Sequence, residues 1–308
     1  MGKPISDFRV VATSAFVSLF DVALNIFVAI ITGSTVMLAQ ALQGLSDLVT
    51  GGILFFGVRR SKRTADHNIQ FGYGREVFFW VLIAGIIMFA GTGGASLYFG
   101  YQQLINPSPV ESVWIAMVML VIGFMTNFYA FRLSLKRLEQ RSNGGSVWKQ
   151  LLSSSIVETK ATFVIDLLGT LAAVFGFVAL LFFIVTGHEQ FDGIGSIVIG
   201  LSMMVGACLL VRDVHDLIVG KAVDSTTSQE IIAAAVSVDG VNEVLDLRTM
   251  YLGSERLLVI MEVHIEDDRH TDEIEQITDN IKHVVHKRIP IVGHIQVEIE
   301  TPDEVSAS

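Results

Sequence analysis

The chain has 308 residues, of which 51% are hydrophobic and 17% charged, and its mean hydropathy is +0.57. This composition favours a membrane protein, because a soluble domain of this size would carry more charge on its surface. The formal net charge of -10 argues against nucleic acid as a partner, since phosphate binding needs a dense basic face. The single cysteine, Cys208, excludes an intramolecular disulfide and a thiolate metal cluster.

Apolar segments occupy most of the first two thirds of the chain, and six of them can each supply the roughly 20 residues of a bilayer-spanning helix. The loops after the second and fourth segments are rich in Lys and Arg, whereas the loops after the third and fifth contain none. Basic loops stay in the cytoplasm, so both termini are expected there. We expect a multi-pass protein of a bacterial inner (plasma) membrane, with spans near residues 8–32, 35–58, 76–104, 112–135, 161–186 and 192–211.

From about residue 220 the chain becomes polar and acidic, and no run is long enough to span a bilayer. Helical spacing alternates here with the period-two pattern of strands, in the order αββαβ. The sequence therefore predicts a mainly α membrane protein with six transmembrane helices over residues 1–215. A small cytoplasmic, metallochaperone-like α+β domain follows over residues 222–308, and dimerisation would help its small core.

Two carboxylates inside predicted spans each follow a neutral oxygen donor by one helical turn. Asp47 follows Gln43 by four residues, so both occupy one helix face, and Asp166 follows Thr162 in the same way. A charged group at bilayer depth is costly and normally faces a wet cavity or a partner. If the second and fifth spans pack together, these four oxygen donors form a cation site. The alternative is two buried acids that are hydrogen-bonded for structural reasons.

The motif "TGSTVMLAQALQGLSD", a basic loop with "FGYGRE", an acid in the fifth span, "FDGIGSIVIG" at the sixth and an αββαβ tail together resemble the cation diffusion facilitator family. The resemblance runs from about residue 10 to 301 and is closest to the branch of mitochondrial-type zinc transporters. It implies a homodimeric exporter of divalent metal driven by proton exchange. It also implies a tetrahedral transport site at Gln43, Asp47, Thr162 and Asp166.

The chain departs from that family at two of these positions. The family usually has His or Asp where this chain has Gln43 and Thr162. The resemblance implies Zn²⁺, but an all-oxygen set suits harder ions such as Mn²⁺, Fe²⁺ or Mg²⁺. Without a site histidine, proton exchange would have to use Asp47 or Asp166. Asp21, in the first span, is a further candidate: it lines the access path, replaces the missing ligand, or pairs with a buried polar neighbour.

Outside the spans, two regions carry weaker metal-binding patterns. In the loop after the second span, Asp66 and His67 cannot close a metal site alone, so the loop is interpreted as structural. In the tail, His264, Glu298 and Glu300 match metal-binding positions of the resembled family and are candidates for a regulatory site that tightens the dimer. The alternative is that the tail histidines are solvated surface residues.

The leading hypothesis for function is a secondary active efflux transporter of a divalent metal cation, working as a cation/proton antiporter by alternating access. The alternative is a membrane metal sensor that binds without transporting. An enzyme is not expected, because the sequence shows no nucleophile with a base, no phosphate loop and no zinc-protease helix. The expected partners are the metal ion, protons, a second copy of the chain and the lipid bilayer. No cofactor is expected.

Overall fold

The computed structural model describes residues 7–141 and 157–302; the side chains of residues 7–18, 137–141 and 158 lie outside the description. The chain divides into two compact units. A helical unit comprises Met1–Arg59 and Phe79–His215, and an α+β unit comprises Arg60–Phe78 and Asp216–Ser308. The loop between the second and third spans therefore groups with the α+β unit.

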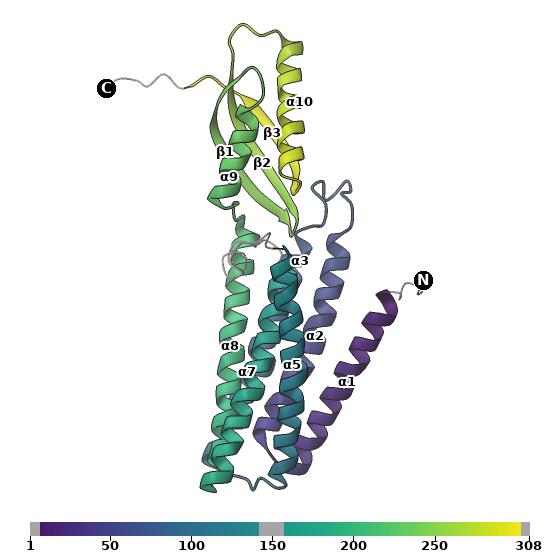
Figure 1. Ribbon diagram of the computed structural model, residues 1–308, viewed down its shortest axis with the longest axis vertical. Coiled ribbons are helices and arrows are strands. Elements are labelled where there is room, and N and C mark those ends of the chain that lie inside the picture. The colour runs from purple at the N-terminus through teal and green to yellow at the C-terminus, as the bar shows by residue number, and fades with distance from the viewer. Residues whose placement is uncertain (1–6, 142–156, 303–308) are drawn as a thin grey trace, which may run out of the picture. The chain divides into compact units, whose positions relative to one another are not determined.

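Long apolar helices form the helical unit, as the sequence predicts (Figure 1). Among the residues whose side chains are described, five stretches are long and apolar enough to cross a membrane: Thr35–Ser61, Glu76–Ile105, Val113–Lys136, Thr159–Thr186 and Gln190–Val219. Six were predicted; in the first helix the apolar part with described side chains, Leu19–Thr32, is shorter. The helices are α1 (Asp7–Thr32), α2 (Thr35–Ser61), α3 (Glu76–Ile87), η1 (Met88–Gly94), α4 (Ala95–Ile105), α5 (Val113–Arg141), α7 (Val157–Thr186) and α8 (Gln190–Val219).

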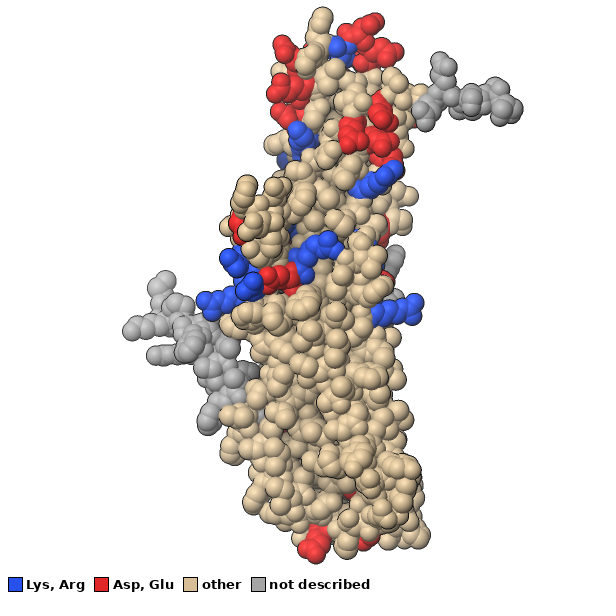
Figure 2. All heavy atoms as spheres, turned by 180° about the vertical axis from the view of Figure 1, so that it is seen from behind, with Lys and Arg blue, Asp and Glu red and all other residues tan. Residues whose placement is uncertain are grey.

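The sides of the helical unit are apolar. Figure 2 shows that the face seen from behind is almost free of charged side chains along the middle of the helices. Large apolar side chains of this unit, such as Phe20, Ile30 and Val205, are more than half exposed. Outward-facing apolar surface of this kind matches a lipid environment rather than water.

The third span is not a uniform α-helix, because its middle segment η1 is a π-helix. Within η1, the Thr92 hydroxyl donates to the backbone oxygen of Leu42 on α2 at 3.2 Å. Beyond it, α4 and α8 approach closely, and a Cβ added to Gly100 would lie 2.7 Å from the Gly193 oxygen. The Ser196 hydroxyl donates to the Ser96 oxygen across the same contact. Small residues thus let these two backbones pack directly on each other.

The start of α2 is fixed by its own cap and by a side chain of α8. Gly33 turns the chain with a positive φ of 65°, and the Ser34 hydroxyl accepts from the backbone nitrogen of Met37 at 3.2 Å. Asp192 accepts from the Thr35 and Val36 nitrogens at 2.6 and 3.2 Å. The backbone donors that a helix start leaves open are therefore satisfied.

The tail forms the predicted αββαβ unit, a three-stranded sheet with two helices that contact each other. The strands lie in the order β1-β2-β3, with β1 and β2 antiparallel and β2 and β3 parallel. Alternate β2 residues such as Val259, Met261 and Val263 are buried, and Ile281 of α10 is equally buried. The elements are α9 (Ser225–Val236), β1 (Val241–Gly253), β2 (Arg256–Ile265), α10 (Thr271–Arg288) and β3 (Val292–Ile299).

The loop between α2 and α3 packs on the end of this sheet. A Cβ added to Gly74 would lie 2.3 Å from the Leu252 oxygen, so only glycine fits this contact. Arg60 and Glu76, at the two ends of the loop, form an ion pair with 2.8 Å between Nε and Oε2. Loop and sheet therefore form one body, which the sequence did not predict.

Candidate metal-transport site

Gln43 and Asp47 lie one turn apart on α2, as the sequence predicts, and Gln43 Nε2 donates to Asp47 Oδ2 at 3.3 Å. The Gln43 side chain is 2% exposed, and its Oε1 has no hydrogen-bond partner among the residues that the structure describes. A buried carbonyl oxygen without a partner costs free energy unless a ligand or water meets it. Gln43 therefore presents an oxygen that is ready to accept a ligand.

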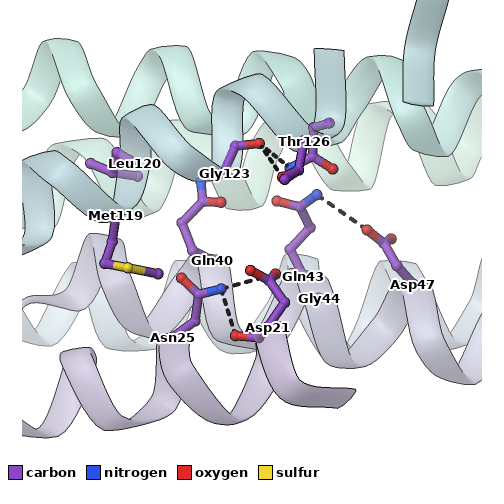
Figure 3. A pocket seen from close by; sticks show the side chains of 11 residues that line it. Asp21, Asn25, Gln40, Gln43, Gly44, Asp47, Met119, Leu120, Gly123 and Thr126 are labelled. Carbon is purple, nitrogen blue, oxygen red and sulfur yellow. Dashed lines mark hydrogen bonds between the residues drawn. The ribbon is translucent and has the colours of Figure 1, made fainter. Parts of the chain in front are cut away.

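A cavity of about 190 Å³ opens beside this pair, between α1, α2 and α5 (Figure 3). Its polar lining combines carboxylates with side-chain amides, and Figure 3 shows Asp21 and Asn25 pointing from α1 toward the α2 side chains. Such a lining supplies oxygen ligands inside an otherwise apolar bundle. The carboxylates are Asp21 and Asp47, and the amides are Asn25, Gln40, Gln43 and Asn127.

The structure places Asp21 in this cavity and also gives it a polar neighbour. Asn25 Nδ2 donates to Asp21 Oδ2 at 3.1 Å and to the Asp21 backbone oxygen at 2.9 Å, which holds the carboxylate in position. Asp21 and Asp47 line the same cavity from two different helices. Asp21 therefore pairs with Asn25 while it shares the cavity with Gln43 and Asp47.

The fifth span, α7, carries the other two predicted donors. Thr162 lies one turn before Asp166, whose Oδ2 accepts a hydrogen bond from the Ser134 hydroxyl of α5. Neither Thr162 nor Asp166 lines the cavity next to Gln43. The convergence of all four donors on one ion stays a prediction.

Helix α7 reaches α2 at a glycine one turn beyond Asp166. A Cβ added to Gly169 would lie 2.5 Å from Gln43 Nε2 and 2.8 Å from Asn127 Oδ1. The predicted packing of the second and fifth spans is therefore present at the level of Gln43. Asp47 follows Gln43 by four residues and Asp166 precedes Gly169 by three, so each carboxylate lies about one helical turn from this contact.

Sequence reasoning missed two polar side chains of this region. Gln40 is 7% exposed and precedes Gln43 by three residues, so its place on the same helix face was a usable signal. Ser134 is 4% exposed and gave no signal, because a serine near the basic end of a span is unremarkable in sequence. Its role follows only from its hydrogen bond to Asp166.

The loop residue Asp66 is engaged within its own loop. Its carboxylate accepts from the Tyr73 hydroxyl at 2.6 Å and from the backbone nitrogens of Asn68 and Ile69 at 3.0 and 2.9 Å. The hydrogen bond from Tyr73, followed by that from Ile69, lowers the pKa of Asp66. These contacts support the structural interpretation of this loop.

The candidate regulatory residues of the tail are only partly brought together. His264 and Glu300 line an open cavity of about 520 Å³, with His264 Nδ1 3.4 Å from the Glu300 backbone oxygen. Glu298 lies opposite Glu262 in the β2–β3 register and accepts from Gln296 at 2.7 Å, outside that cavity. Over residues 7–141 and 157–302, no three His, Cys, Asp or Glu side chains are grouped so that they could hold a metal ion.

Comparison with known proteins assigns both units. Residues 11–219 match the cation efflux transmembrane domain, and residues 223–302 match the cation efflux protein cytoplasmic domain. The mitochondrial proton-coupled zinc antiporter SLC30A9 of Homo sapiens is 24% identical over 73% of this chain, although the match spans only 40% of that protein's length. The cation-efflux pump FieF of Escherichia fergusonii is 23% identical over 91% of this chain and 88% of its own length.

Among solved structures, the nickel form of a MamM CTD variant is similar to 26% of this chain and matches over its whole length, at 21% identity and a TM-score of 0.25. The match to the cation efflux transmembrane domain covers more than half of the chain, and the cytoplasmic-domain match adds most of the remainder. This protein therefore belongs to the cation diffusion facilitator family of cation efflux transporters.

Proposed function

We propose that this chain exports a divalent metal cation from the cytoplasm by alternating access, in exchange for protons. One observation carries the proposal: a polar cavity inside an apolar helical bundle places Asp47 beside the unpartnered oxygen of Gln43. Carboxylate and amide oxygens replace the hydration shell of a divalent cation. The two negative charges of Asp47 and Asp166 offset the ion's charge, which lowers the free energy of its passage through the bundle.

The proposed orientation of the chain in the membrane rests on the charge of the loops. Basic residues follow α2 and α5, and the loops after α4 and α7 contain neither Lys nor Arg. This asymmetry supports cytoplasmic termini and a cytoplasmic α+β unit. An inner (plasma) membrane location in a bacterium is part of the same proposal.

Which ion is carried depends on the donors. The name of the human relative specifies zinc and proton coupling. The candidate donors of this chain are oxygens, which suit Mn²⁺, Fe²⁺ or Mg²⁺ better than imidazole or thiolate ligands would. We propose a hard divalent cation as the preferred cargo, with Zn²⁺ as the competing ion. Introducing an imidazole with Gln43→His or Thr162→His should shift the preference toward Zn²⁺.

The test uses purified protein in proteoliposomes, with Mn²⁺ and Zn²⁺ offered separately under an imposed pH gradient. Metal uptake coupled to proton movement in the opposite direction supports the antiporter. Metal binding without flux would instead favour the membrane sensor. Uptake of Zn²⁺ but not Mn²⁺ would contradict the proposed ion preference and leave the transport proposal intact.

We further propose that the α+β unit holds two copies of the chain together and responds to cytoplasmic metal. The match to a family cytoplasmic domain over residues 223–302 and the acidic surface of this unit support the proposal (Figure 2). His264, Glu298 and Glu300 remain the proposed regulatory ligands. Truncation before residue 222 should weaken dimerisation but leave cation binding in the helical unit detectable, because its proposed ligands precede residue 170.

A further inference from the structure

The cavity between α1, α2 and α5 has its own set of oxygen donors, separate from those of α7. Asp21 and Asp47 enter it from two different helices, and Thr162 and Asp166 are absent from its lining. Asn25 is itself buried and orients Asp21 by donating to Oδ2 at 3.1 Å. A polar neighbour that fixes a carboxylate's orientation is typical of a metal ligand's surroundings.

Unpartnered polar atoms point to a ligand in the same cavity. Oε1 of Gln43 and Nε2 of Gln40 are both buried and have no hydrogen-bond partner within the part of the chain that the structure describes. Their side chains are 2% and 7% exposed, and both line the cavity. Buried polar atoms normally have a hydrogen-bond partner. Two such atoms without a partner, beside two carboxylates, therefore indicate a binding place for a cation and its water.

We propose that this cavity is a second cation subsite, in which Asp21, Asp47 and Oε1 of Gln43 bind a divalent cation independently of Asp166. The proposal deepens the transport function and rests on it. Asp47 belongs to both subsites, because it lines the cavity with Asp21 and its hydrogen-bond partner Gln43 contacts Gly169 of α7, one turn from Asp166. The ion thus moves between a position near Asp21 of α1 and a position near Asp166 of α7, and Asp47 remains a ligand in both.

The size and chemistry of the cavity define the cargo that this subsite accepts. Its volume of about 190 Å³ leaves room for several water molecules, each of which occupies about 30 Å³ in the liquid. Two carboxylates, one amide oxygen and retained water suit a hard ion that prefers an octahedral set of oxygen ligands. Mn²⁺ is such an ion, and its paramagnetism allows binding to be measured directly.

Asn127 of α5 lies where the two positions would meet. Its Nδ2 donates to the Gly123 oxygen at 2.9 Å, which turns Oδ1 toward Gly169 of α7. The oxygen therefore lies between the cavity and the helix that carries Asp166. An ion moving from one carboxylate pair to the other passes this neutral oxygen.

Mn²⁺ binding to the purified full-length protein in detergent, followed by electron paramagnetic resonance, tests the subsite. Asp47→Asn removes the shared ligand, so the Mn²⁺ that this variant still binds defines the background from the tail. Asp166→Asn should retain a site above that background. Adding Asp21→Asn to it should weaken the remaining site at least about tenfold, to the background level.

Two results overturn the subsite: an Asp166→Asn protein that binds only at background, or a double variant that binds as well as Asp166→Asn alone. Glu111→Gln, in the loop before α5, is the matched control for loss of one negative charge and should change neither value. Flux of the unmodified protein in proteoliposomes separates this inference from the proposed function. Mn²⁺ binding that depends on Asp21, without any metal flux, would contradict the proposed transport function but support the second subsite.

Discussion

The carboxylate of Asp192, at the start of α8, lies 2.6 Å from the backbone nitrogen of Thr35, at the start of α2 and 157 residues away in sequence. The same carboxylate accepts from the Ser34 and Thr35 hydroxyls at 2.5 and 2.8 Å. Asp192 is fully buried. One side chain of α8 therefore fixes where α2 begins, and with it the depth of Gln43 and Asp47.

We expect Asp192→Ala to destabilise the helical unit by about 2 kcal/mol or more, because it removes both a helix cap and several charge-assisted hydrogen bonds. Thermal unfolding of the purified protein in detergent measures the loss. Asp192→Asn keeps one acceptor oxygen and should cost less than the alanine variant. An unchanged unfolding midpoint in both variants would show that the cap contributes nothing to stability.

Asp47→Asn and Asp166→Asn should each lower metal flux by roughly 100-fold or more, since leaving a desolvated charge without its partner costs about 3–5 kcal/mol. Gln43→Ala and Thr162→Ala should lower flux less, because water can replace a neutral oxygen donor. Initial rates in proteoliposomes at several Mn²⁺ concentrations provide the measurement. Wild-type flux in both Asn variants would show that the two carboxylates are not needed for transport and have a structural role.

Gly169→Ala should impair transport without removing any ligand. The added Cβ would lie 2.5 Å from Gln43 Nε2, and such overpacking costs about 1–3 kcal/mol. Either α7 moves away from α2 or Gln43 leaves its position beside Asp47. Gly51→Ala is the matched control, since no atom lies within 4 Å of its added Cβ. Equal flux in the two variants would show that the close contact is dispensable.

The loop carboxylate Asp66 gives a pH prediction. The Tyr73 hydroxyl, and then the Ile69 nitrogen, lower its pKa below the ordinary value of 3.8. An acid with a lowered folded-state pKa stabilises the fold above its unfolded pKa, and this stabilisation is lost as the pH falls through the folded value. The hydrogen bonds to the Asp66 carboxylate therefore stabilise the loop at neutral pH, and this stabilisation is lost only below about pH 3.8.

Tyr73→Phe should raise the pKa of Asp66 toward its ordinary value, because the largest stabilising contact to the carboxylate is lost. Carbon-13 NMR titration of the Asp66 carboxyl group in the full-length protein measures the change. An identical Asp66 titration in both proteins would remove Tyr73 as the cause.

Topology follows from the loop charges and can be tested with single cysteines. In a Cys208→Ser background, cysteines at Asn106 and His188 should react with an impermeant maleimide from outside the cell. Cysteines at Thr64 and Asn280 should react only after permeabilisation. External labelling at position 64 would overturn the proposed orientation.

Local pattern was enough to predict the elements of this protein. The period-two alternation in the tail predicted its strands, the first of which the structure shows as Val241–Gly253, and the apolar runs predicted the long helices. The four-residue step from Gln43 to Asp47 predicted their shared face, on which the two side chains make contact at 3.3 Å. These features depend on neighbours within about one turn or one strand, so the sequence states them directly.

Tertiary structure decided which of those elements meet. Nothing in the local pattern brings Asp21 of α1 into one cavity with Asp47, gives Asp166 a partner in Ser134, or caps α2 with Asp192. The π-helical conformation of η1 was not predicted either, because the glycines of "MFAGTGG" weaken an α-helix locally without specifying which conformation replaces it. Each of these contacts depends on how helices that are far apart in sequence pack together. A single sequence shows the helical period of each segment, but it does not show which helix faces will pair.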